Sequence, residues 1–184
     1  MHSGKDHEAE ALTRRMIADF DAAGVDVIIT NAGGCGSHLK QFSPKCKDIA
    51  EFLVELGPRA ARLPVQMRVA YHDSCHLQHA QKVRTQPRQL LAGIPGLTVE
   101  EIPENTLCCG SAGIYNLVQP RTADELGDRK ASHIQALAPD AVATGNVGCI
   151  LQMRAALDRR GQNSPVFHTI QILDASLRGT TPGR

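Results

Sequence analysis

The chain has 184 residues and a formal net charge of +1, with 20 basic and 19 acidic side chains and no basic run, which argues against nucleic-acid binding. Hydrophobic residues make up 42% of the chain, too many for a disordered protein, and no apolar run is long enough to predict a membrane span. The first residues are rich in charge and histidine, unlike a signal peptide, so we expect a cytoplasmic protein whose six cysteines are thiols or metal ligands rather than disulfides.

The first third of the chain predicts a helix, a strand and two further helices. An apolar stripe of helical period indicates a helix over 8–20, and the β-branched run "VDVIIT" at 25–30 indicates a buried strand. A glycine-rich turn leads into a short helix within 31–42, and a second apolar stripe predicts a helix over 49–56. The segment "GPRAARLP" at 57–64 is the predicted linker.

The rest of the chain alternates short apolar runs with helical segments. Strands are predicted at 67–73, 98–103 and 140–146. Thr122 and Glu125 form a capping-box pattern at the start of a long helix, and 165–176 is predicted as a short strand or a terminal helix. Strands that alternate with helices indicate parallel α/β layers.

Residues 23–42 and 137–156 form an internal repeat, because each has an Asp, a short apolar strand, an Asn, a Gly-Cys pair and a helix in the same order. Such a repeat implies duplication. The second copy has a partner segment upstream, residues 67–136, whereas the first has none, so we expect a chain truncated at its N-terminus. The expected fold is a duplicated α/β cysteine-rich domain with three-layer, Rossmann-like parallel sheets, incomplete over 1–62 and complete over 63–184.

Four cysteines of the second copy follow the ends of predicted strands. Cys75 follows one strand, Cys108 and Cys109 follow the next, and Cys149 follows the third. Ligands bind at the carboxyl edge of open α/β sheets, so we expect these three segments to converge on one site. Cys35, the cysteine of the first copy, is a further candidate.

This arrangement favours thiolate ligation of a metal. Cys75 and Cys149 lie near predicted helix N-termini, where free N–H groups and the helix dipole stabilise a thiolate. Gly110, Gly113 and Gly148 let the backbone approach an inorganic core and donate N–H bonds to its sulfurs. Soft thiolates select iron–sulfur clusters or zinc, and adjacent cysteines fit a multi-iron cluster better than one zinc tetrahedron.

Two other interpretations of single cysteines stay open. A buried cysteine is often a small apolar residue, and this is the interpretation we prefer for Cys46. Cys75, with His72 or His76 nearby, resembles the thiolate–histidine pair of a thiol–disulfide enzyme, although that role leaves the other three cysteines unused.

Four segments carry a family resemblance: "NAGGCGSHLK", "HDSCHLQHAQKVRTQPRQLL", "IPENTLCCGSAGIYNLVQP" and "RKASHIQALAPDAVATGNVGC". Together they resemble the C-terminal part of the iron–sulfur subunit of glycolate oxidase (glycolate dehydrogenase), in a family that includes the B-type component of heterodisulfide reductase. The resemblance implies the end of one Cys-Cys-Gly domain and all of a second. Cys75, Cys108, Cys109 and Cys149 match cysteine positions of the family, and Asn146 stands where its fullest motif has another cysteine.

The resemblance implies an iron–sulfur cluster of the [4Fe–4S] type held by these four cysteines, with zinc as the alternative occupant. The residues expected around the ligands are Gly110, Gly113, Asn146, Gly148 and His76. The chain would belong to an oxidoreductase that converts glycolate to glyoxylate and would pass electrons from flavin-containing subunits toward quinone, without holding the catalytic centre. Its location would be cytoplasmic, with peripheral attachment to the inner face of the cytoplasmic membrane. Lactate or another 2-hydroxyacid stays open as the substrate, and a zinc-binding or metal-free docking module of the same complex is the alternative function.

Overall fold

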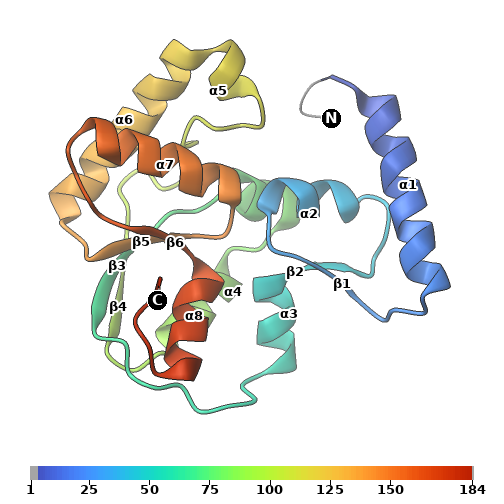
Figure 1. Cartoon of the computed structure of the whole chain (residues 1–184), viewed down its shortest axis with the longest axis horizontal. Coiled ribbons are helices and arrows are strands. Elements are labelled where there is room, and N and C mark those ends of the chain that lie inside the picture. Colours follow the sequence, from blue (N-terminus) through green and yellow to red (C-terminus); the bar gives the residue numbers. More distant parts are fainter. Residues whose placement is uncertain (1–3, 184) are drawn as a thin grey trace.

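Residues 4–183 are described by the computed structural model, in which helices cover both faces of a four-stranded sheet and a smaller sheet lies beside it (Figure 1). In the larger sheet the strand order is β4-β3-β5-β6, and all neighbouring strands are parallel. These strands are β3 (Met67–Tyr71), β4 (Leu97–Glu101), β5 (Ala141–Thr144) and β6 (Val166–His168). The predicted parallel α/β class is therefore confirmed.

The two central strands are buried on both faces. Every residue of β5 is buried, as are the last three of β3, which explains why these segments read as short, continuous apolar runs. Side chains alternate between the faces: Val69 and Ala143 belong to one core, whereas Ala70 and Val142 belong to the other. Two cores, one on each face of the sheet, produce the three-layer arrangement.

Each core is closed by its own set of helices. One face carries α3 (Ile49–Leu56), α4 (Thr85–Ala92) and α8 (Thr169–Arg178), and the other carries α6 (Pro120–Leu137) and α7 (Val147–Arg159). Figure 1 shows the sheet between α7 and α8. Leu91 and Ile172 on one face and Ile134 on the other have no exposed surface, and burying each such side chain contributes about 1.5–3 kcal/mol.

The smaller sheet consists of β1 (Ile28–Thr30) and β2 (Cys46–Asp48), which are parallel and lie beside α1 (Asp6–Ala22) and α2 (Gly33–Leu39). Cys46 is 3% exposed within its core, so its assignment as a small buried residue is confirmed.

The prediction of a buried strand over 25–30 is wrong in extent. The strand has three residues, and Ile29 on it is 44% exposed. The reason is that the small core of Ile28, Leu39 and Cys46 covers the face of β1 that carries Ile28, whereas Ile29 points to the opposite face.

The internal repeat extends further in the structure than in the sequence. The order β1, α2, β2, α3 is matched by β5, α7, β6, α8, and in each set the two strands pair in parallel. Cys35 and Cys149 are each the third residue of the helix after the first strand. Asp48 and His168 each begin the last helix with a capping box. The boundary at residues 62 and 63 stays a prediction.

The start of the long helix differs from the prediction. Thr122 does not cap α6, because the helix already begins at Pro120, whose fixed φ suits the first helical position. Thr122 therefore lies inside the first turn. Within residues 4–183, no helix combines the length and the apolar character needed to span a bilayer.

Candidate metal centre

The carboxyl edge of the larger sheet brings five cysteines to the wall of one cavity. Cys75 follows β3 and directly precedes the π-helix η1 (His76–Gln81), Cys108 and Cys109 lie in the loop after β4, and Cys149 lies in the first turn of α7 after β5. They line a cavity of about 210 Å³ together with Cys35 from α2. Cys109 and Cys149 are each 2% exposed, Cys75 and Cys108 are half-buried, and Cys35 is exposed.

The four thiols of the second copy interact with one another in a row. Cys75 interacts with Cys108, Cys108 with Cys109, and Cys109 with Cys149. Bonds from Cys109 and then Cys75 lower the pKa of Cys108 to about 2, and the bond from Cys109 lowers the pKa of Cys149 well below its usual value. The bonds to these neighbours, followed by burial, raise the pKa values of Cys75 and Cys109. A bound cation would take the place of the protons that these thiols share.

Three of the residues predicted around the ligands contact a sulfur. The Gly110 N–H donates to Cys108 Sγ over 3.4 Å, and Asn146 Nδ2 donates to Cys149 Sγ over 3.4 Å. His76 Nδ1 lies 3.5 Å from Cys75 Sγ. The other two, Gly113 and Gly148, line the cavity without a hydrogen bond to sulfur.

Cys35 reaches this wall because α2 packs closely on η1. A Cβ at Gly33 would lie 3.1 Å from Ser74 Oγ, and Gln81 Nε2 donates to the Gly33 carbonyl over 2.9 Å. Cys35 is exposed, whereas Cys109 and Cys149 in the same cavity wall are buried.

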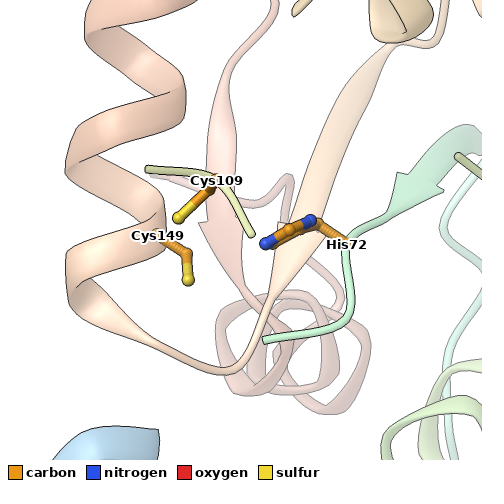
Figure 2. Close-up of side chains that lie close together, drawn as sticks. All are labelled: His72, Cys109 and Cys149. Atoms are coloured by element: carbon orange, nitrogen blue, oxygen red, sulfur yellow. The ribbon is translucent and has the colours of Figure 1, made fainter. Parts of the chain in front are cut away.

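His72 is a potential ligand that the sequence prediction missed. It follows β3, is 1% exposed, and one of its ring nitrogens lies within 4.8 Å of the sulfurs of Cys109 and Cys149, which lie within the same distance of each other (Figure 2). Neither ring nitrogen has a hydrogen-bond partner at ordinary distance, although the nearby imidazole contributes to the low pKa of Cys149. Its place at the end of a strand, like that of the cysteines, is the signal that could have found it.

A partly buried ion pair and a neighbouring asparagine hold the segments that carry the thiols. Both oxygens of Asp73 accept hydrogen bonds from Arg88, over 2.8 and 2.7 Å, and the Asp73 N–H donates to Asn105 Oδ1 over 2.9 Å. The Asp73 side chain therefore turns to Arg88 and does not cap the helix that follows Cys75. The ion pair joins the segment before Cys75 to α4, and the Asp73–Asn105 bond joins that segment to the loop before Cys108.

Lys130 is a second buried charge near the site. It has no exposed surface, and its Nζ donates to the Glu104 carbonyl over 2.7 Å, at the start of the Cys108–Cys109 loop. Burial lowers its pKa, whereas Cys109 acts in the opposite direction. A buried ammonium near thiolates offsets part of their charge.

The donor set fits a thiolate-bound metal group. Five cysteines line a single cavity, the buried imidazole of His72 lies close to two of their sulfurs, and two of the sulfurs already accept N–H bonds of the kind that stabilise thiolate ligands. Fold and site together define a parallel α/β protein with a cluster of thiols at the carboxyl edge of its sheet.

The chain belongs to the CCG cysteine-rich domain family, whose sequence profile matches residues 1–40 and 69–154. It is 36% identical over 90% of its length to the "Probable glycolate oxidase iron-sulfur subunit" of Bacillus subtilis (strain 168). It is 39% identical over 82% of its length to a fumarate reductase (CoM/CoB) subunit of Methanothermobacter marburgensis, and 31% identical over 84% to the "Glycolate oxidase iron-sulfur subunit" of Escherichia coli (strain K12). The resemblance seen in the sequence is confirmed.

The chain spans less than half of each of these relatives. It covers 41% of the Bacillus subtilis protein, 32% of the Methanothermobacter marburgensis protein and 41% of the Escherichia coli protein. The activities named for the relatives therefore belong to longer polypeptides.

Proposed function

We propose that this chain is the iron–sulfur module of an electron-transfer subunit, with a [4Fe–4S] cluster held by Cys75, Cys108, Cys109 and Cys149. The observation that supports this most is the row of four interacting sulfurs contributed by three separate segments at one sheet edge. A single buried cysteine needs no such neighbours, and four close thiolates repel one another unless a cation lies between them.

An iron–sulfur cluster bound at this place would supply one-electron redox chemistry. The part of the chain is to hold and tune it. The Gly110 N–H and the Asn146 amide withdraw charge from Cys108 and Cys149, which favours the reduced form of a cluster. The burial of Cys109 and Cys149 excludes water on one side, while the half-buried Cys75 and Cys108 leave an approach for electrons on the other.

The proposed complex oxidises glycolate, or a related 2-hydroxyacid, to the 2-oxoacid. Support comes from relatives named as glycolate oxidase iron-sulfur subunits. In this proposal a flavin-containing subunit removes the hydrogens from the substrate, this chain accepts the electrons one at a time, and a quinone receives them. The complex would lie in the cytoplasm, attached peripherally to the inner face of the membrane.

One observation favours a second candidate, a zinc-binding docking module. The ligand atoms of His72, Cys109 and Cys149 lie within 4.8 Å of one another, a grouping that suits a single tetrahedral ion as well as one iron of a cluster. Metal analysis separates these candidates.

The test is the metal content of the anaerobically purified or reconstituted protein. We expect iron and acid-labile sulfide with a broad visible absorption band. Cys109→Ala should abolish the band and the iron, whereas Cys46→Ala, which changes a buried cysteine outside the cavity, should leave both unchanged. Stoichiometric zinc, or a protein with no metal, would contradict the proposal.

A further inference from the structure

A backbone hydrogen bond to the sheet holds His72 in place, rather than a hydrogen bond of its imidazole ring. Its N–H donates to the Ala143 carbonyl over 2.8 Å, so the backbone at the end of β3 is fixed against β5. Figure 2 shows the imidazole pointing toward Cys109 and Cys149 with one ring nitrogen leading. The three side chains come from three different segments: the end of β3, the loop after β4 and the first turn of α7.

The spacing of these side chains is close to that of ligands on one ion. With metal–sulfur bonds of about 2.3 Å and metal–nitrogen bonds of about 2.0 Å, ligand atoms of a tetrahedral site lie about 3.5–3.8 Å apart. The three donor atoms here are all within 4.8 Å of one another, so shifts on the order of 1 Å bring them onto a common ion. Side-chain torsions alone can provide shifts of that size.

The environment of the ring is unfavourable without such an ion. A neutral imidazole has one donor and one acceptor nitrogen, and leaving either unbonded inside a protein is unfavourable. His72 is 1% exposed, and neither nitrogen has a hydrogen-bond partner at ordinary distance. A metal ion would satisfy the nitrogen that faces the two sulfurs.

His76 is the competing source of nitrogen at this site. Its Nδ1 lies 3.5 Å from Cys75 Sγ, but it is only half-buried and stands at the other end of the row of sulfurs. It is not part of the group formed by His72, Cys109 and Cys149. Its position suits a hydrogen bond to the Cys75 sulfur.

We propose that His72 binds the same metal ion as Cys109 and Cys149 through a ring nitrogen, which gives the centre one neutral nitrogen donor among its thiolates. This inference rests on the proposed function for the identity of the metal group. A neutral imidazole adds less negative charge than a thiolate, so the centre is easier to reduce than an all-cysteine one.

The experiment compares wild type with His72→Gln, His72→Cys, His76→Gln and the exposed control His79→Gln, all purified anaerobically, with circular dichroism as the check on folding. The bound metal is identified by elemental analysis. For an iron cluster, electron spin-echo modulation of the paramagnetic state is recorded with ¹⁴N- and ¹⁵N-labelled histidine. A directly bonded nitrogen is expected in wild type, His76→Gln and His79→Gln, and its loss in His72→Gln. His72→Cys should keep the iron, lose the nitrogen signal and have a more negative midpoint potential.

Each result separates the two proposals. Iron without a bonded nitrogen, or a nitrogen signal that survives in His72→Gln, overturns the role of His72 and leaves the iron–sulfur module standing. Zinc in place of iron overturns the module, and the zinc X-ray absorption spectrum then decides on His72: a nitrogen lost in His72→Gln supports it, and an all-sulfur site overturns it. A protein that binds no metal overturns both. If His72→Gln does not fold, His72→Cys carries the comparison.

Discussion

Gly110 shapes the site because it has no side chain. Gly110 follows the cysteine pair with φ +96, a region that other residues rarely adopt. A Cβ at this position would also run into the backbone carbonyl of Ala123 in α6. The tight turn that lets the Gly110 N–H reach Cys108 Sγ is therefore open to glycine alone.

Gly110→Ala should lower the free energy of unfolding by more than the 1–2 kcal/mol that a positive φ costs alone, because the Ala123 carbonyl must also move. Gly24→Ala is the matched control: Gly24 has φ +68, and a Cβ there would meet nothing within 4 Å. Urea unfolding of the two variants measures the difference. Equal losses would show that the contact with Ala123 is unimportant.

The positions of the cysteines in the fold could be predicted from the sequence, whereas the side-chain contacts of the residues around them could not. Cys75 and Cys149 could be placed at the sheet edge because apolar runs mark where strands end. The contacts of Asp73 and His72 could not, because they depend on the direction of each side chain. Asp73 turns to Arg88, fifteen positions along the chain, and a local capping rule has no information on that partner.

Among the elements, the two capping boxes begin equivalent helices with different chemistry. Asp48 Oδ1 accepts from the Ala50 N–H over 2.9 Å, whereas His168 Nδ1 accepts from the Ile170 N–H over 3.2 Å. Burial raises the pKa of Asp48 to about 6, because a carboxylate that is 2% exposed is poorly hydrated. The folded protein therefore keeps a proton that the unfolded chain has released between pH 4 and pH 6.

This difference predicts that stability falls as the pH rises through that window. Asp48→Asn keeps the capping oxygen and removes the titration, so its free energy of unfolding should equal that of wild type near pH 4 and exceed it by up to about 3 kcal/mol at pH 7. Urea titrations from pH 4 to pH 7 measure this, with the exposed Asp158→Asn as control. A constant difference across the range would mean that Asp48 does not titrate there.

The strands were predictable where the sequence carries a run of apolar or β-branched residues, which includes β4 although none of its residues is fully buried. β3 and β5 are buried on both faces and appear in the sequence as apolar runs. β2 was missed because its three residues, "CKD", contain no apolar pattern, and β1 is shorter than its run suggested. For 165–176 the sequence left strand and helix open, and the structure contains both, β6 followed by α8.

In the whole molecule, the proposed metal centre is where segments far apart in sequence meet. Cys75, Cys109 and Cys149 come from three separate segments, so a bound metal would cross-link these segments and stabilise the folded state by mass action. The central strands do not depend on it alone, because β3 and β5 also pack into the apolar core on the α3, α4 and α8 face, which contains none of these cysteines.

Removal of the metal with a chelator should therefore loosen the site without unfolding the protein. Hydrogen exchange should accelerate in residues 105–111 and in η1, while the amides of β5 and α3 keep their protection. Mass spectrometry of exchanged peptides resolves these regions. A uniform loss of protection would instead show that the metal is required for the entire fold, and no change would show that it plays no part in ordering the loops.

The contact between α2 and η1 gives the two sheets a mechanical connection. These helices lie so close together that a side chain at Gly33 or Gly36 would have no room. Gln81 of η1 donates a hydrogen bond to the Gly33 carbonyl of α2. On the other side, His168 Nε2 lies 3.0 Å from the Asn31 carbonyl at the turn before α2. A displacement of the smaller sheet must therefore also displace Cys75. The visible absorption of a bound cluster would then report movement of the smaller sheet relative to the larger one.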